Sequence, residues 1–184
     1  INRYLDVIYG NPGSFHGKGL EAKDALEDAR ERISKMLNCN PKEIIFTGGG
    51  TESINLALKG LAKIMKGKKN HIITSKVEHH AVLHTCEYLE KYEGCEITYL
   101  DVDKYGMVDS EDVKNAIKEN TFLITIMYAN NEIGSINPIK EIGEIARKNN
   151  IYFHTDACQA AGYCDINIEN LNVDMMTINA SKLY

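Results

Sequence analysis

Apolar positions along this chain follow two periodicities in turn. Segments with apolar residues at three- and four-residue spacing, typical of amphipathic helices, alternate with short runs of β-branched and aromatic residues, typical of buried strands. The expected helices cover residues 19–37, 51–66, 79–92, 110–119 and 138–149. The expected strands cover residues 43–47, 71–75, 96–102, 122–129, 151–157 and 174–179.

Strands that alternate with helices predict parallel pairing with right-handed crossovers, and therefore a layered α/β domain. No internal repeat, low-complexity segment or Pro/Gly-rich linker interrupts the alternation. We therefore expect the 184 residues to form one domain.

Polar or glycine-rich segments follow five of the expected strands. They are GGGTES (48–53), VEHH (77–80), NNEIG (130–134), DACQ (156–159) and ASK (180–182). Ligands of open α/β sheets bind where the carboxyl ends of the strands meet the connecting loops. We therefore expect a functional site at that edge of the sheet.

Composition and charge limit the classes of partner and the cellular compartments that we expect. The formal net charge of -5 disfavours nucleic acid, because phosphate binding uses clustered Lys and Arg. The longest apolar run, residues 122–129, is too short to cross a bilayer, and the first residues do not resemble a secretory signal. The five scattered cysteines form no CxxC pair, which argues against a disulfide framework and against metal sites built from such pairs. We expect a cytoplasmic protein that binds neither nucleic acid nor membrane.

The segment FTGGGTES (46–53) is a candidate anion site. Its glycines let backbone amides approach a ligand, and a helix that begins at Thr51 directs its positive dipole end toward an anion. The segment matches neither the Walker loop nor the GxGxxG fingerprint. A glycine turn with Thr51 as the helix N-cap explains the same residues equally well.

Two charged residues at strand ends suggest cofactor chemistry. Asp156 ends an expected strand, and a buried carboxylate needs a cationic partner such as a protonated pyridine nitrogen. That pairing makes pyridoxal phosphate (PLP) an electron sink, although a helix-capping aspartate is the alternative. Lys182 follows the last expected strand, where an amine could form a Schiff base, although a lysine taken alone is ordinarily solvated. Cys158 is interpreted as a packing residue rather than a nucleophile.

The histidines divide into three cases. His80 and His84 have the HxxxH spacing of two metal ligands on one helix face, but neither an HExxH glutamate nor a third ligand is identifiable, so we expect no metal site. His79, at a strand-to-helix turn, could stack on a flat cofactor. His71 and His154 have no partner that the sequence reveals.

Taken together, six segments resemble the NifS/IscS-type cysteine desulfurases of the class V aminotransferase family. The segments are YGNPGSFH, FTGGGTESINLALKG, VEHHAVLHTCEYLE, YANNEIGSINPI, HTDACQA and NASKLY, in the order and spacing of that family. The resemblance implies a PLP-dependent transferase of fold type I, with a three-layer sandwich and a mostly parallel sheet. It also implies a homodimer that converts L-cysteine to L-alanine and passes the sulfur to a protein persulfide, and from there to a sulfur-acceptor or iron–sulfur scaffold protein.

The same resemblance implies roles for individual residues near the ring of the cofactor. Lys182 would hold PLP as a Schiff base and His79 would stack on the ring, and these two would be the catalytic residues. Asp156 would pair with the pyridine nitrogen and Gln159 would bond the ring hydroxyl. Asn131, in preference to its neighbour Asn130, would lie beside the cofactor; taken in isolation, such a pair is more commonly a simple Asn-rich turn.

The resemblance also implies a set of phosphate ligands. Gly50 and Thr51 would hold the phosphate at the start of a helix. Asn179 and Ser181 occupy the positions of a phosphate-contacting Ser-x-His in many members, so a hydroxyl replaces an imidazole here. Gly50 stands where Ala is more usual.

Parts of the family pattern have no match in this chain. None of the five cysteines matches the reactive cysteine, which lies on a loop after the lysine. The Gly-Pro-Lys-Gly segment, the C-terminal small domain and the region before INRYLD also have no match. We therefore expect residues 1–184 to be part of the PLP-binding large domain and to be inactive alone.

Three other interpretations remain open. The chain could belong to another class V PLP enzyme, such as a selenocysteine lyase or an aminotransferase. It could be a non-catalytic scaffold with the PLP fold, although such a scaffold has no need for Lys182, Asp156 and His79 together. A nucleotide-binding module that uses GGGTES is the weakest of the three, since no ribose-binding acid or P-loop lysine is apparent.

Overall fold

The computed structural model describes residues 2–183, with the side chain of residue 2 left out. The chain separates into two compact units, Ile1–Phe46 and Thr47–Tyr184. The single domain expected from the sequence stays a prediction.

The first unit consists mainly of one long helix. Its elements are α1 (Asn2–Asp6), α2 (Gly17–Leu37) and the 3-10 turn η1 (Pro41–Glu43). The helix α2 confirms the helix predicted over residues 19–37. It begins after His16, whose Nδ1 accepts a hydrogen bond from the Gly19 N–H, and it ends at Asn38 in the left-handed conformation.

The strand expected over residues 43–47 is absent from the described structure, and this prediction was wrong. Asn40 and Glu43 form a capping box instead, in which the Glu43 carboxylate accepts the Asn40 N–H at 2.7 Å and turns the chain into η1. The residues that follow have no partner strand, and the side chains of Ile45 and Phe46 are 66% and 43% exposed. A run of apolar residues becomes a strand only where a neighbouring strand satisfies its backbone groups.

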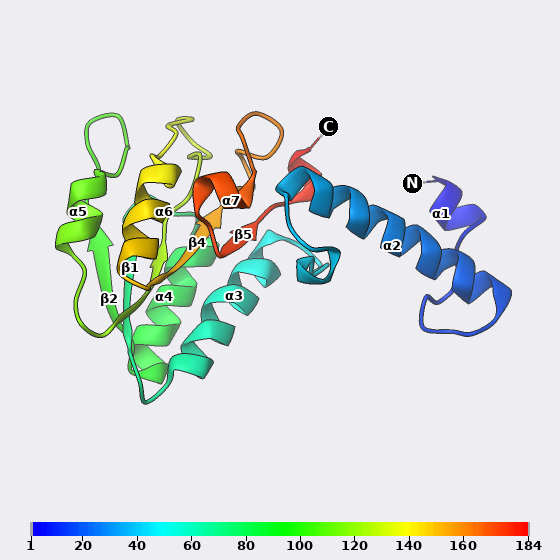
Figure 1. Cartoon of the computed structure of the whole chain (residues 1–184), viewed down its shortest axis with the longest axis horizontal. Coiled ribbons are helices and arrows are strands. Elements are labelled where there is room, and N and C mark those ends of the chain that lie inside the picture. The colour runs from blue at the N-terminus through cyan, green and yellow to red at the C-terminus, as the bar shows by residue number, and fades with distance from the viewer. Residues whose placement is uncertain (1, 184) are drawn as a thin grey trace. The chain divides into compact units, whose positions relative to one another are not determined.

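The second unit is built on a five-stranded sheet (Figure 1). The strands are β1 (His71–Ser75), β2 (Glu96–Leu100), β3 (Thr121–Thr125), β4 (Tyr152–Asp156) and β5 (Met175–Thr177). Their order is β2-β1-β3-β4-β5, and every pairing is parallel. The expected parallel α/β fold is confirmed, and each of these strands lies within an expected one apart from a one-residue extension at Thr121.

Helices cover both faces of this sheet (Figure 1), so the unit has three layers. The helices α3 (Gly50–Met65) and α4 (His80–Glu93) enclose one apolar core. The helices α5 (Ser110–Asn115), α6 (Ile139–Lys148) and α7 (Ile168–Leu171) enclose the other. Of these, α7 was not expected, and neither was the 3-10 turn η2 (Ala180–Lys182). Within residues 2–183, no helix is both long and apolar enough to span a bilayer.

Two buried histidines link neighbouring strands through threonine hydroxyls. His71 joins β1 to β2 and β3, and His154 joins β4 to β3 and β5. The hydroxyl partners are those of Thr121 (2.7 Å) and Thr98 (2.8 Å) for His71, and of Thr125 (2.9 Å) and Thr177 (3.0 Å) for His154. Burial lowers the pKa of both rings, that of His154 to about 4. Both imidazoles are therefore neutral structural groups at neutral pH, with partners that the sequence could not reveal.

His154 should make the protein sensitive to acid. Its pKa is about 4 when folded and 6.5 as the ordinary value, so the unfolded chain takes up the proton first as pH falls. The contribution of His154 to the free energy of unfolding is complete above about pH 6.5 and is lost as pH falls through about 4. The whole loss amounts to about 3 kcal/mol. The variant His154→Gln keeps an acceptor and a donor for the two hydroxyls but does not titrate, so its unfolding free energy should fall less between about pH 7 and about pH 5.

Urea unfolding followed by circular dichroism at stepped pH measures this difference. The exposed His84, replaced in His84→Gln, provides the matched control and should follow the wild-type profile. Parallel profiles for wild type and His154→Gln would contradict the neutral, buried role of His154.

Candidate active site

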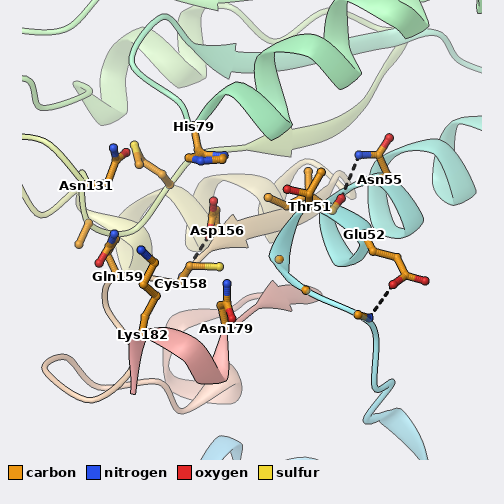
Figure 2. A pocket seen from close by; sticks show the side chains of 16 residues that line it. Thr51, Glu52, Asn55, His79, Asn131, Asp156, Cys158, Gln159, Asn179 and Lys182 are labelled. Atoms are coloured by element: carbon orange, nitrogen blue, oxygen red, sulfur yellow. Dashed lines mark hydrogen bonds between the residues drawn. The ribbon is translucent and has the colours of Figure 1, made fainter. Parts of the chain in front are cut away.

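One cavity lies at the carboxyl ends of the strands, and Figure 2 shows the side chains that line it. Its volume is about 760 Å³. Eight of the nine residues that the sequence analysis nominated line it: Gly50, Thr51, His79, Asn131, Asp156, Gln159, Asn179 and Lys182. Residues from five separate segments therefore meet at one place. Four of these segments follow strands of the sheet, as the strand-end argument predicted, whereas the glycine segment follows residues 43–47, which form no strand.

Ser181 is the nominated residue that does not line the described cavity. Its hydroxyl donates to Asn179 Oδ1 at 3.0 Å, and its backbone N–H donates to the same oxygen at 3.1 Å. Ser181 therefore orients the side chain of Asn179, which does line the cavity. A direct contact between Ser181 and a phosphate stays a prediction.

The first turn of α3 is open toward the cavity. Its N-cap is Gly49, which offers no side chain to the free backbone N–H groups, and Gly50 is the first helical residue. The alternative in which Thr51 caps the helix is therefore wrong. Uncapped N–H groups at the positive end of a helix form a binding site for an anion.

Hydrogen bonds around the glycine segment hold this open turn in place. The Gly48 N–H donates to Glu52 Oε2 at 2.6 Å, and the Thr47 hydroxyl donates to the Gly49 carbonyl at 3.1 Å. The hydroxyls of Thr47 and Ser53 lie 2.9 Å apart. Thr47 and Glu52 lie in the segment FTGGGTES, but the sequence alone suggested no role for either. The signal for Glu52 was its place, as an acidic residue, in the first turn of a helix that follows three glycines.

Gly50 lies against Cys158 and Asn179. A Cβ on residue 50 would be 3.0 Å from Cys158 Sγ and 3.6 Å from Asn179 Nδ2. The first distance is shorter than an ordinary van der Waals contact, so a larger residue would have to displace the sulfur. The glycine at residue 50 and the cysteine at residue 158 therefore fit one another sterically.

Asp156 ends β4 inside the cavity with 5% of its surface exposed. Its Oδ1 accepts the Cys158 N–H at 3.0 Å, which closes a turn rather than capping a helix. No lysine or arginine of the described chain forms an ion pair with it. Burial, together with the negative charge of Asp156, raises the pKa of the Cys158 thiol, so this thiol is protonated and a poor nucleophile at neutral pH.

Lys182 and Asn179 extend from η2 toward Asp156 and Cys158 (Figure 2). Asn179 is the N-cap of η2, and the Lys182 N–H bonds to its carbonyl at 3.0 Å. The Lys182 side chain is solvent-exposed at the cavity, and its positive charge partly offsets the rise in the pKa of Cys158. The short turn thus places an amine and an amide at one edge of the site.

His79 is the N-cap of α4 and presents its ring to the cavity (Figure 2). Its Nδ1 accepts the Ala81 N–H at 3.1 Å, so the neutral ring carries its proton on Nε2. His80 and His84 instead stack on each other with ring centroids 5.3 Å apart, on the exposed side of α4. Within residues 2–183, no group of three His, Cys, Asp or Glu side chains is arranged to hold a metal ion.

Asn130 and Asn131 have different surroundings. Asn130 is buried, its Nδ2 donates to the Val77 carbonyl at 3.2 Å, and its Oδ1 accepts the N–H groups of Glu132 and Ile133 at 2.9 and 3.1 Å. Asn131 is exposed and lines the cavity. The turn interpretation therefore fits Asn130, and a place beside a ligand fits Asn131.

A buried carboxyl group that the sequence analysis passed over lies next to these residues. Glu78, 5% exposed, accepts the Ser75 hydroxyl and the Met127 N–H on Oε1, both at 2.8 Å. Its Oε2 is buried and has no hydrogen-bond partner in the described structure. Burial raises the pKa of Glu78 to about 8, and the charge of Asp156 adds to that effect. The only sequence signal was an acidic residue in the segment that follows a buried strand.

Comparison with known sequences identifies the family. The sequence model of the class V aminotransferases matches residues 1–184. The chain belongs to the class V aminotransferase family. Cysteine desulfurase IscS of Clostridium botulinum is 54% identical over 176 residues, which cover 96% of this chain and 44% of that protein. The mitochondrial cysteine desulfurase of Saccharomyces cerevisiae is 49% identical over 183 residues, which cover 99% of this chain and 37% of that protein.

Solved structures agree with the sequence relatives. SspA in complex with cysteine matches this class V aminotransferase chain with a TM-score of 0.95 at 42% identity, over 99% of this chain and 52% of that one. A NifS-like protein matches with a TM-score of 0.94 at 41% identity, and the match covers 98% of this chain and 50% of that one. The resemblance to the NifS/IscS type and the fold class are confirmed. The chain spans less than half the length of the IscS relative.

The steric fit between Gly50 and Cys158 can be tested by a double-mutant cycle. Gly50→Ala should destabilise the protein by about 1–2 kcal/mol, because the added methyl group displaces Cys158 Sγ. Cys158→Ala removes that sulfur, so Gly50→Ala should cost less in the Cys158→Ala background, with a coupling of about 1 kcal/mol. Urea unfolding of the four proteins measures the coupling, and strictly additive effects would show that the two residues do not interact.

Proposed function

We propose that residues 1–184 form the PLP-binding part of a cysteine desulfurase, which converts L-cysteine to L-alanine and yields sulfur as a protein persulfide. The observation that carries this proposal is the meeting of an open helix terminus, the buried Asp156, His79 and Lys182 in one cavity. The close relatives named as cysteine desulfurases, and the solved complex of SspA with cysteine, support the substrate.

The residues present fit PLP. Its phosphate suits the uncapped N-terminus of α3 at Gly50 and Thr51, where no side chain occupies the free backbone N–H groups. Its pyridine nitrogen, protonated, suits Asp156, a buried carboxylate without an ion-pair partner in the described structure. When bound, PLP supplies an electron sink for the α-carbon of an amino-acid substrate.

The remaining cavity residues orient the cofactor and handle protons. Lys182 is the amine that would bind the cofactor carbonyl carbon covalently. His79 would stack on the ring and hold a proton at Nε2. Gln159 would donate to the ring hydroxyl, and Asn131 and Asn179 would supply further amide donors.

The thiol that accepts the sulfur is proposed to lie outside the described residues. Cys158 is the one cysteine among the described lining residues, and its raised pKa makes it unsuited to attack. Residues 1–184 alone should therefore bind PLP without turning over cysteine. In the intact protein, we propose a cytoplasmic homodimer that serves iron–sulfur cluster assembly or another sulfur acceptor.

The Schiff-base role of Lys182 can be tested by absorbance. After unbound PLP has been removed, the intact protein should keep a near-visible band that Lys182→Ala lacks, because Lys182 is the lysine among the described cavity residues that can hold the cofactor covalently. Lys140→Ala, on the exposed side of α6, is the matched control and should keep the band. An unchanged band in Lys182→Ala would refute the proposal.

The pairing of Asp156 with the pyridine nitrogen can be tested by dialysis. Asp156→Asn keeps the shape of the side chain but removes its charge, so PLP affinity should fall by about 10-fold or more. The protein without PLP should be no less stable, since the variant removes a buried charge that has no ion-pair partner. Unchanged PLP affinity in Asp156→Asn would exclude this pairing.

A further inference from the structure

The turn between β1 and α4 is tied to the end of β3 at two points. The Met127 N–H donates to Glu78 Oε1 at 2.8 Å, and Asn130 Nδ2 donates to the Val77 carbonyl at 3.2 Å. The Ser75 hydroxyl adds a third hydrogen bond, to the same Glu78 oxygen, at 2.8 Å. Glu78 is followed directly by His79, whose ring lines the cavity. Met127 lines the same cavity. The position of the His79 ring therefore depends on the Glu78 carboxyl group.

The surroundings of Glu78 favour its neutral form. Both hydrogen bonds reach Oε1, while Oε2 is buried with no partner in the described structure, so an ionised carboxylate would leave charge on an unsolvated atom. The titratable groups that face Glu78 are Asp156 on β4 and Cys86 on α4, and neither is cationic. Its hydrogen-bond partners, the Ser75 hydroxyl on β1 and the backbone N–H of Met127 after β3, do not titrate.

We propose that Glu78 is a positioning residue that acts as a neutral carboxylic acid and holds the His79 turn against the end of β3. The proton lies on Oε2, and Oε1 accepts the two hydrogen bonds that fix the turn. Ionisation places a charge on buried Oε2, so the turn opens to solvate that charge and the His79 ring leaves its position. The link from the turn to PLP affinity rests on the proposed function, whereas the tie between the turn and β3 does not.

Substitutions at Glu78 test whether this side chain acts as a neutral carboxylic acid or as a charged carboxylate. Glu78→Gln retains an acceptor oxygen for Ser75 and Met127 and cannot ionise, whereas Glu78→Ala removes the tie. At about pH 6.5, PLP affinity of Glu78→Gln should equal that of wild type within about twofold, and Glu78→Ala should bind about 10-fold more weakly. Above about pH 8, wild type should lose affinity relative to Glu78→Gln. Equal losses in Gln and Ala variants at the lower pH would overturn the proposal, because the carboxylate charge would then be what matters.

A second measurement does not need the cofactor. In the protein without PLP, amide hydrogen exchange at Met127 and Ala81 should be at least 10-fold faster in Glu78→Ala than in wild type, and Glu78→Gln should restore protection. The folded-state pKa of Glu78 is raised, so its stabilising contribution is complete below the unfolded value of 4.5 and is lost as pH rises through about 8. The folding equilibrium constant of wild type relative to Glu78→Gln should therefore fall at least 10-fold between about pH 5 and about pH 8.

These measurements distinguish a failure of the positioning role of Glu78 from a failure of the proposed function. If exchange and stability behave as stated but no variant binds PLP, the positioning role stands and the proposed function fails. If PLP binds through Lys182 but exchange at Met127 and Ala81 does not respond to Glu78→Ala, the proposed function stands and the positioning role fails. A wild-type stability profile parallel to that of Glu78→Gln would also overturn it.

Discussion

Main-chain pairing between β3 and β4 positions the groups of the cavity. The regular ladder joins residues 123–125 to residues 152–154, but the pairing continues past the end of β3. There the N–H groups of Ile126 and Tyr128 donate to the carbonyl oxygens of His154 and Asp156 at 3.2 and 2.9 Å. This extension carries Met127, and the loop that holds Asn131, alongside Asp156. β3 is the central strand of the sheet and also pairs with β1.

Burial in the sheet and beside it favours the neutral form of two titratable side chains. His154 and Glu78 are buried near Asp156, and burial drives each toward its neutral form. Their hydrogen bonds then serve structure: His154 joins three strands, and Glu78 joins the turn after β1 to the end of β3. Asp156, by contrast, faces a cavity that also holds Lys182. The fold thus separates buried groups that stabilise it from the group that is available to a cationic ligand.

The sequence analysis was strongest where side chains act through local spacing and strand ends. It found the five strands of the sheet, and the strand ends pointed to His79, Asp156 and Lys182, because the carboxyl ends of parallel strands share one edge. Gln159 and Asn179 were assigned roles only through the family resemblance. It was wrong about residues 43–47, where the apolar pattern of a strand was present without a neighbour to pair with. The proposed phosphate contact of Ser181, whose hydroxyl bonds to Asn179 at 3.0 Å, stays a prediction. Glu78 was given no role.

The sequence by itself determined the alternation of helices and strands, the parallel arrangement and the set of polar strand ends. These depend on periodicity and on connection rules that act over short stretches of chain. Only the tertiary structure decided that Gly49 leaves the first turn of α3 uncapped, that Asn130 is buried in a turn, and that Cys158 and Glu78 keep their protons. The physical reason is that desolvation and hydrogen bonding depend on segments far away in sequence, as when the N–H of Met127 reaches the carboxyl group of Glu78.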